Sequence, residues 1–440
     1  MLLPKGVIQC LIEENHLEFK TLCVIGMGYI GLPTASIFAS NGVQVTGMDT
    51  NADIIKGLQA GRLHIFEPGL RGLLLEALNS GRLKISNEVT PADAFIIAVP
   101  TPFFEDKRAD LRAVIAASES IVPHLQRGNL VILESTSPPR TTVDIVAPIL
   151  EKSGLRAGVD FLLAYSPERV LPGRILRELV DNPRVIGGID AKSAEAGRDL
   201  YRKFVKGDII LTDATTAEMV KLMENTSRDI NIAIANEFSR LAQTFDVDIW
   251  EAIGIANLHP RVDILRPGVG VGGHCISVDP WFLVEAAPDV SHLIKTARGV
   301  NDGQPAFVAE HIKHISGGIE GKKIAFLGLA FKPNVDDVRE SPAVELVHLL
   351  ADDGAMVFAY EPFAPGAMLP GIQLVNSLEA ALDDADLIVL GVGHDRFKDL
   401  DPAAVRTMTR AELVYDAVHA WDKAAWEAAG FQFFGLARKF

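Results

Sequence analysis

A glycine-rich segment carries a thiol that could act as a nucleophile. Residues 267–280 read PGVGVGGHCISVDP, so four glycines lie in the seven residues before the pair His274 and Cys275. Glycines at this density let a backbone approach a ligand closely. A thiol at the start of the following turn or helix has its pKa lowered, which favours the nucleophilic thiolate. The alternative is a buried structural cysteine, the role that we expect for Cys10 and Cys23.

A glycine turn near the N-terminus has the spacing of a dinucleotide-binding motif. Gly26, Gly28 and Gly31 follow a strand-length apolar run and precede a helix-length stretch. In this context the first glycine makes the turn, the second lets the backbone approach the pyrophosphate, and the third packs helix on strand. Asp49 ends the next apolar run, where its carboxylate would accept from ribose hydroxyls and repel a 2′-phosphate. The turn therefore predicts NAD rather than NADP.

Two strand ends and a second glycine turn supply further candidate contacts. Thr101 in VPTP and Thr136 in ESTSP follow predicted strands, at the edge where open α/β sheets bind ligands. Either threonine could instead be only a cap. The turn at Gly328 lacks the three-glycine spacing and carries Phe331 and Lys332, which suit a base or sugar and a phosphate. The alternative there is a surface lysine beside a core phenylalanine.

Three polar residues share the spacing of a helix face. Lys221, Asn225 and Arg228 stand at i, i+4 and i+7, so they could converge on one site. A solvated polar stripe would have the same spacing.

The hydrophobic pattern predicts the elements that hold these residues. Strand-length apolar runs alternate with helix-length segments in residues 20–133, and the pattern recurs in residues 322–392. This alternation is typical of doubly wound α/β sheets, so we expect two Rossmann-like domains. Between them lies a proline-free helical pattern of about 30 residues, capped by Asp213. We expect it to form a long central helix that joins the domains and mediates dimerisation.

Composition narrows the class of protein. The chain has 440 residues, 48% of them hydrophobic, which is enough for two or three domains. A net charge of -15 argues against a nucleic-acid or anionic membrane partner. Three cysteines cannot form a disulfide framework, and the isolated His274–Cys275 pair does not predict a metal site. Without a signal peptide, transit peptide or membrane-length apolar run, we expect a soluble cytoplasmic protein.

Together these segments resemble the UDP-glucose/GDP-mannose dehydrogenase superfamily over residues 20–421. The resemblance rests on VPTP, LESTSPP, YSPERVLPG, NPRVIGG, TAEMVKLMENTSRDINIAIANE, HPRVDILRPG, VGGHCISVDPWF and AFKPNVDDVRESPA. It is nearest to the branch that oxidises UDP-N-acetyl-D-mannosamine. The UDP-glucose branch has Ser before the cysteine and Phe-Pro-Lys-Asp after it, whereas this chain has His274 before Cys275 and Ile-Ser-Val-Asp279 after it.

The resemblance implies a domain order and a reaction. The expected parts are an N-terminal extension, an NAD-binding Rossmann domain, a central helical dimerisation domain with the cysteine loop, and a UDP-sugar-binding Rossmann-like domain, at residues 1–19, 20–212, 213–305 and 306–440. The implied reaction is the four-electron oxidation of the sugar C6 alcohol to a carboxylate with two NAD in turn. We expect it to serve bacterial surface polysaccharide synthesis, in a homodimer in which Arg261 reaches the neighbouring subunit's site.

Roles carry over from the family motifs position by position. Cys275 is the implied nucleophile, which forms a thiohemiacetal and then a thioester, and Lys221 is the acid/base residue. Asn225 and Asp279 position water and the oxyanion, and Glu168 acts as acid or base at the thioester stage. The predicted cofactor contacts are Gly26, Gly28, Tyr29, Ile30, Gly31, Asp49, Thr101, Thr136 and Arg339. The predicted substrate contacts are Arg169, Val170, Lys221, Asn225, Arg228, His259, Arg261, Gly272, Phe331 and Lys332.

Other interpretations stay open. The same chemistry could act on UDP-GlcNAc or UDP-glucose, because only the shape of the pocket separates these sugars. A two-electron dehydrogenase of the hydroxyacid or acyl-CoA kind would need no cysteine. A non-catalytic nucleotide-sugar-binding protein would keep the fold without turnover. Two positions depart from the family pattern: Val269 stands where relatives often have Pro, and Asp422 stands where they often have a substrate-contacting Arg.

Overall fold

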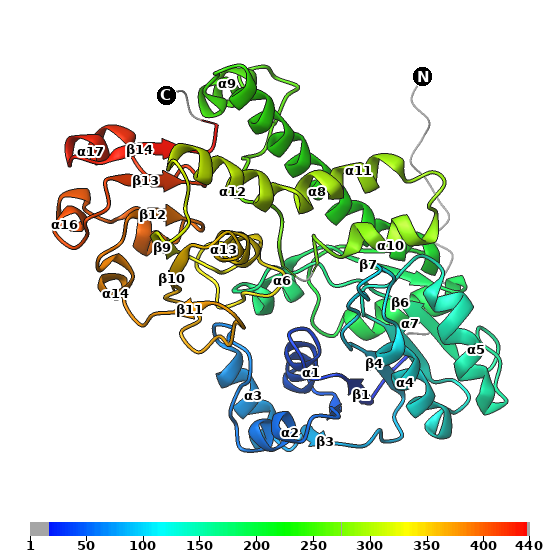
Figure 1. Ribbon diagram of the computed structural model, residues 1–440. Coiled ribbons are helices and arrows are strands. Elements are labelled where there is room, and N and C mark those ends of the chain that lie inside the picture. Colours follow the sequence, from blue (N-terminus) through cyan, green and yellow to red (C-terminus); the bar gives the residue numbers. More distant parts are fainter. Residues whose placement is uncertain (1–16, 274, 438–440) are drawn as a thin grey trace, which may run out of the picture. The chain divides into compact units, whose positions relative to one another are not determined.

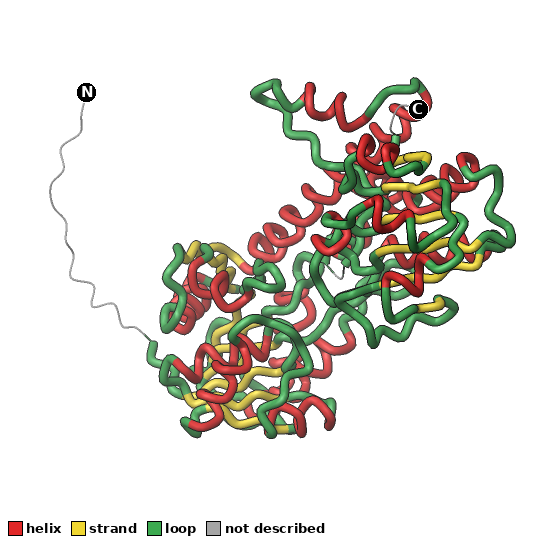
Figure 2. Tube along the Cα trace, turned by 90° about the vertical axis from the view of Figure 1, so that its left-hand side faces the viewer, coloured by secondary structure: helices red, strands yellow, loops and turns green. Residues whose placement is uncertain are grey.

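The structure, a computed structural model, describes residues 17–273 and 275–437 (Figures 1 and 2). Cys10, His274 and residues 1–16 of the predicted N-terminal extension lie outside the described residues. The chain divides into two compact units. The first holds residues up to 104 together with 109–221, and the second holds residues 105–108 together with those from 222 onward.

The first unit contains an eight-stranded sheet. Its strands are β1 (Thr21–Ile25), β2 (Gln44–Met48), β3 (Leu83–Ser86), β4 (Ala94–Ile97), β5 (Leu130–Leu133), β6 (Leu162–Tyr165), β7 (Arg184–Gly188) and β8 (Ile209–Asp213). The order across the sheet is β3-β2-β1-β4-β5-β6-β7-β8. Neighbours run parallel, except that β7 runs antiparallel to β6.

Helices cover both faces of this sheet (Figure 1). They are α1 (Gly31–Ser40), α2 (Ala52–Gln59), α3 (Leu70–Asn79), α4 (Arg112–Ile121), α5 (Ala147–Leu150), α6 (Ile175–Asp181) and α7 (Ala191–Tyr201). Short 3-10 turns at Val122–His124 and Glu151–Ser153 follow α4 and α5, and a π-helical segment, Thr142–Val146, leads into α5.

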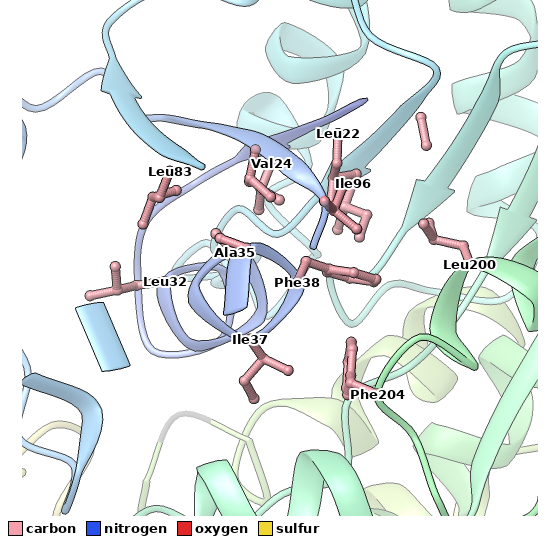
Figure 3. Packing of buried hydrophobic residues seen from close by; sticks show 14 of the residues in the cluster. Leu22, Val24, Leu32, Ala35, Ile37, Phe38, Leu83, Ile96, Leu200 and Phe204 are labelled. Carbon is pink, nitrogen blue, oxygen red and sulfur yellow. The ribbon is translucent and has the colours of Figure 1, made fainter. Parts of the chain in front are cut away.

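Alternation along each strand explains the two helical layers. Leu22 and Val24 of β1 pack in the hydrophobic cluster that contains Phe38 of α1, as Figure 3 shows. Cys23 and Ile25 pack in the cluster on the other face, with α4 and α5. Because both faces of the strand are buried, its sequence is continuously apolar. The predicted doubly wound fold is confirmed.

An aromatic cluster joins α1 to α7 on the first of these faces. The ring centroid of Phe38 lies 4.8 Å from that of Phe204 and 5.7 Å from that of Tyr201. Such tilted and edge-on contacts stabilise a core beyond the area that they bury. They fix the ring of Tyr201, whose hydroxyl reaches a buried polar cluster described below.

The second unit contains a six-stranded sheet. Its strands are β9 (Lys323–Leu327), β10 (Met356–Tyr360), β11 (Gln373–Leu374), β12 (Leu387–Leu390), β13 (Leu413–Asp416) and β14 (Gln432–Gly435). The order β11-β10-β9-β12-β13-β14 matches that of the first six strands of the first sheet. The helices are α9 (Ile249–Ala256), α10 (Asp279–Ala286), α11 (His292–Asp302), α12 (Gln304–Ile315), α13 (Pro342–Asp352), α14 (Leu378–Leu382), α15 (Asp395–Lys398), α16 (Pro402–Arg406) and α17 (Lys423–Ala428).

The two sheets share a hydrogen-bonding device as well as an order. The carboxylate of Asp93, before β4, accepts from the amide of Thr21 at 2.9 Å. Asp386, before β12, accepts in the same way from the amide of Lys323 at 2.9 Å. Each acid ties the start of the first strand to the start of the fourth, so the two sheets repeat a hydrogen bond as well as a strand order.

The acid that ends the second strand behaves differently in the two units. Glu361 follows β10 and is 2% exposed. Its Oε2 accepts from the amides of Leu329 and Ala330 at 2.7 and 2.9 Å and lies 3.0 Å from His394 Nε2. Burial alone would raise the pKa of Glu361, but the hydrogen bond and charge of His394 and the amides of Leu329 and Phe363 lower it below its ordinary value. Asp49, its counterpart after β2, is only half-buried.

Helix α8 (Ala214–Thr244) is the long central helix that the sequence predicts. The carboxylate of Asp213 accepts from the amide and the hydroxyl of Thr216 at 2.9 and 2.6 Å, as the predicted cap requires. Within the described part of the chain, no helix combines the length and the apolar character that crossing a bilayer requires.

Candidate active site

The glycine turn between β1 and α1 has one glycine for each of three spatial demands. Gly26 has a φ of +97°, and a Cβ there would lie 2.5 Å from the carbonyl oxygen of Ala98. A Cβ on Gly31 would lie 1.8 Å from the carbonyl oxygen of Gly26. A Cβ on Gly28 would meet nothing within 4 Å. The turn is therefore tight at its first and third glycines and open at the second, where a pyrophosphate is expected.

Alanine at Gly28 should impair NAD binding, whereas alanine at Gly31 should impair folding. Gly28→Ala should leave the melting temperature within about 2 °C of the parent and weaken NAD binding at least about tenfold, because its Cβ occupies only the space kept for the ligand. Gly31→Ala should fold poorly, because its Cβ collides with backbone. Thermal melts and NAD titrations check both, and normal NAD affinity in Gly28→Ala would contradict the assignment.

The remaining predicted cofactor residues of the first unit lie at or beside this sheet edge. Tyr29 and Ile30 are half-buried and directly precede α1. Asp49 accepts from the amides of Met27 and Asn51 at 2.9 and 2.8 Å, which fixes its carboxylate next to the turn.

Thr101 and Thr136 lie beyond the carboxyl ends of the neighbouring strands β4 and β5. The hydroxyl of Thr101 donates to the carbonyl oxygen of Thr136 at 2.6 Å. This bond uses the hydroxyl's proton and leaves its oxygen able to accept. The two threonines thus form one linked pair, a contact that the sequence did not predict.

Glu168 lies on a loop after β6 that acidic side chains fix at several points. Glu67, 4% exposed, accepts from the amides of Gly173 and Ile175 at 2.7 and 2.8 Å. Glu178 accepts from the amide of Leu171 at 2.8 Å. These bonds order the segment that also carries the predicted substrate contacts Arg169 and Val170. Arg169 donates to the carbonyl oxygen of Pro183, and Val170 packs against the core.

A buried polar cluster beside Glu168 was not predicted from the sequence. It comprises Glu134 at the end of β5, Ser166 after β6, Arg184 on β7 and Tyr201 on α7. Arg184 is 4% exposed and pairs with both Glu134 and Glu168. The available sequence clue was the charge itself, because Glu134 and Arg184 interrupt apolar strand ends where a charge needs a buried partner.

The cysteine loop of the second unit packs against the second glycine turn. A Cβ on Gly272 would lie 2.4 Å from the carbonyl oxygen of Glu340, and one on Gly273 would lie 2.9 Å from the ring of Phe331. Glycine is therefore required for the loop to reach this position. Cys275 is half-buried and opens the turn that leads into α10, where its carbonyl oxygen accepts from the amide of Asp279 at 2.8 Å.

Hydrogen bonds from amide side chains fix the start of the same loop. Asn236 on α8 accepts from the amide of Gly268 at 3.0 Å, and Gln304 on α12 donates to the carbonyl oxygen of Gly268 at 3.2 Å. Asn236 in turn donates to Asn301 at 2.9 Å. Both backbone groups of Gly268 are thus fixed by buried side chains, which anchors the loop upstream of the thiol.

The three polar residues predicted to share a face of α8 differ in exposure. Lys221 is buried, Asn225 is half-buried and Arg228 is exposed. Asn225 donates to Asp279, which is 2% exposed, at 2.5 Å. The structure thus joins two of the predicted catalytic residues, although they are far apart in the sequence.

The other predicted contacts lie on loops of the second unit. His259 and Arg261 are exposed after α9. Lys332 Nζ lies 5.5 Å from the ring centroid of Phe331, which places the predicted cation and ring together. Arg339 forms a two-pronged pair with Asp337, at 2.9 and 2.7 Å.

Both departures from the family pattern have structural roles. Val269 is 4% exposed and packs in the core of the second sheet, so it anchors the loop by burial. Asp422 caps α17 by accepting from the amide of Ala425 at 2.8 Å. Among the described residues, no group of three or more His, Cys, Asp or Glu side chains could hold a metal ion.

Two Rossmann-type sheets, one with a dinucleotide turn and one beside a thiol loop, define a dinucleotide-dependent dehydrogenase. Comparison with known proteins makes the class specific. Residues 20–205, 215–303 and 325–423 match the NAD binding, central and UDP binding domains of the UDP-glucose/GDP-mannose dehydrogenase family. The chain belongs to this family of nucleotide-sugar dehydrogenases.

Three similar proteins are themselves named as nucleotide-sugar dehydrogenases. UDP-N-acetyl-D-mannosamine dehydrogenase of Methanocaldococcus jannaschii is 46% identical over 431 residues, 97% of this chain and 98% of that protein. NDP-N-acetyl-D-galactosaminuronic acid dehydrogenase of Ralstonia solanacearum is 47% identical over 396 residues, 88% of this chain and 93% of that protein. The solved structure of UDP-D-ManNAc dehydrogenase from Pyrococcus horikoshii has a TM-score of 0.88 at 42% identity and covers 95% of this chain and 99% of its own.

Proposed function

We propose that the protein oxidises UDP-N-acetyl-D-mannosamine at C6 to the uronate, in two NAD-dependent steps that proceed through a thioester on Cys275. The observation that carries the proposal is the cysteine loop, whose thiol opens the turn into α10 while the Asn225–Asp279 pair holds the same helix. We keep the four predicted parts: an N-terminal extension (residues 1–19), an NAD-binding domain (20–212), a central helical domain (213–305) and a UDP-sugar-binding domain (306–440).

The first step removes a hydride from C6 and a proton from its hydroxyl, which gives an aldehyde and NADH. A general base must take the proton, and we assign that role to Lys221, acting with water held by Asn225 and Asp279. Gly26, Gly28, Tyr29, Ile30, Gly31, Asp49, Thr101, Thr136 and Arg339 are the proposed NAD contacts. The other proposed substrate contacts are Arg169, Val170, Arg228, His259, Arg261, Gly272, Phe331 and Lys332.

The second oxidation needs the thiol because an aldehyde carbon must become tetrahedral before it can lose hydride. The Cys275 thiolate adds to the carbonyl, and the thiohemiacetal passes hydride to a second NAD, which leaves a thioester. Water then attacks the acyl carbon, Glu168 takes its proton, and the carbon–sulfur bond breaks to release the carboxylate and the thiolate. The net result is two NADH for each sugar.

The test is the NADH yield with a panel of UDP-sugars. With UDP-N-acetyl-D-mannosamine we expect two NADH per sugar and the highest kcat/KM of the panel. Much faster turnover of UDP-GlcNAc or UDP-glucose would overturn the choice of sugar but not the chemistry. One NADH per sugar would favour a two-electron dehydrogenase, and binding without turnover would favour a non-catalytic nucleotide-sugar-binding protein.

We also propose a homodimer formed through α8. Ile234, Phe238 and Leu241 share one face of α8, Phe245 directly follows the helix, and these side chains are 40–71% exposed, so a second copy would cover them. Phe238→Glu should yield a monomer by light scattering, with Thr244→Glu as the control.

If Arg261 acts across the dimer, mixing Arg261→Ala with Cys275→Ala protein should restore some activity. We place the reaction in the cytoplasm, in bacterial surface polysaccharide precursor synthesis.

A further inference from the structure

Two donors fix the carboxylate of Glu168 in one orientation. The amide of Arg169 donates to Oε1 at 2.8 Å, and Nη2 of Arg184 donates to Oε2 at 2.5 Å. The Glu168 side chain is 10% exposed and that of Arg184 is 4% exposed. A charge-assisted bond between groups shielded from water is stronger than one at a surface. Glu168 therefore has one well-defined position.

Three further side chains fix the guanidinium of Arg184. Its Nη1 donates to Ser166 Oγ at 3.0 Å and to Glu134 Oε1 at 3.3 Å. The guanidinium carbon lies 4.1 Å from the ring centroid of Tyr201, whose hydroxyl donates to the same oxygen of Glu134 at 2.7 Å. Because these groups lie on β7 and α7 and directly after β5 and β6, the core of the first unit fixes the guanidinium.

The cluster holds one cation between two carboxylates. Burial raises the pKa of Glu134 to about 7, an effect that Arg184 opposes and the charge of Glu168 reinforces. Among the described residues, Oε2 of Glu134 has no hydrogen-bond partner. The charged or titratable groups that act on Glu134 are Arg184, Tyr201 and Glu168. Glu134 can therefore gain or lose a proton near neutral pH, whereas Arg184 stays charged.

We propose that Arg184 is the positioning residue of Glu168 and that Glu134, on the other side of the guanidinium, sets how firmly Glu168 is held. An ionised Glu134 shares the cation and leaves Glu168 a stronger base, and a protonated Glu134 leaves the cation to Glu168 alone. This inference rests on the proposed function, in which Glu168 takes the proton of the water that hydrolyses the thioester. Arg184 exchanges no proton in that step.

Arg184→Lys tests the positioning role, because lysine keeps the charge but cannot bridge both carboxylates as the planar guanidinium does. We expect a burst of two NADH per site at the parent rate and then a steady-state kcat about 10–100-fold lower, because a misplaced general base loses part of its usual contribution. The acylated Cys275 should accumulate and appear as a mass increase of the intact protein. KM for the UDP-sugar should not rise.

Arg198→Lys is the matched control, because Arg198 lies on α7 and pairs with Asp199, away from Glu168. It should keep parent kinetics. If Arg184→Lys only lowers the burst amplitude and no acyl-enzyme forms, Arg184 supports the fold alone and the inference is overturned.

Glu134→Gln tests the second part and keeps the shape of the side chain. In the parent, kcat should rise between about pH 6 and pH 8 as Glu134 loses its proton, and the variant, which has no proton to lose there, should lack this rise. A merely structural role would lower the melting temperature and leave the rise in place. A variant that keeps the rise, or a parent that lacks it, would overturn the role of Glu134.

The parent enzyme separates failure of this inference from failure of the proposed function. If the parent gives neither two NADH per sugar nor a Cys275-dependent second oxidation, the reaction is wrong and the inference falls with it. If the parent gives both while the Arg184 and Glu134 variants behave as structural changes, only the inference is wrong.

Discussion

Replacing Cys275 by serine is expected to lower turnover to the carboxylate by at least about three orders of magnitude. A thiol is a few per cent ionised at pH 7, whereas a serine hydroxyl without an adjacent base is essentially un-ionised, so the tetrahedral adduct needed for the second hydride transfer is lost. The first oxidation should persist. The expected products are an aldehyde, trapped by hydroxylamine, and no more than one NADH per sugar.

Cys23→Ala is the control for this experiment. Cys23 is fully buried within β1, and burial raises the pKa of its thiol, so it is a core residue without a nucleophile's setting. We expect two NADH per sugar from this variant. Two NADH from Cys275→Ser at the parent rate would remove the thioester from the mechanism.

Arg298→Met is expected to lower the free energy of unfolding by a large amount. Arg298 on α11 is 1% exposed and pairs with the fully buried Asp229 of α8 at 2.6 Å. Removing the cation leaves a buried carboxylate without its counter-charge, which costs about 3–5 kcal/mol of unfolding free energy. Denaturant titration of the second unit's transition measures the loss.

Two further measurements test the origin of that loss. Burial raises the pKa of Asp229 and Arg298 opposes the rise, so without Arg298 the carboxylate should protonate more readily. The loss should therefore shrink as the pH falls. The double variant Asp229→Leu/Arg298→Met should recover much of the stability, because no unpaired charge remains. Equal losses at all pH values, or additive losses in the double variant, would indicate a packing effect instead.

The sequence predicted the two sheets and the first glycine turn. Both sheets were predictable because buried parallel strands are continuous apolar runs, and the glycine turn at Gly26 was predictable because its spacing serves a single backbone geometry. The antiparallel pairing of β7 with β6 and the π-helical segment before α5 could not be predicted. Hydrophobic periodicity contains no information on the direction of a strand or the pitch of a helix.

Candidate site residues were predictable where a motif contains them and not where partners come from distant strands. Cys275 and Asp279 are close in sequence, so one motif covers both. Glu134 directly follows β5 and Arg184 begins β7, and only the folded sheet brings them together behind Glu168. A charge at the end of an apolar strand could have indicated that a partner exists, but the sequence does not identify that partner.

The buried Glu361 has a consequence for the order of events. Its carboxylate accepts from two amides of the second glycine turn and lies against His394, whereas Asp49 accepts from only one amide of the first turn, that of Met27. Under the proposed function, the two NAD therefore bind in succession at the turn at Gly26, because the amides of the second turn are held by Glu361. The half-oxidised sugar then stays on the enzyme during the exchange, and we expect its covalent bond to Cys275 to hold it there.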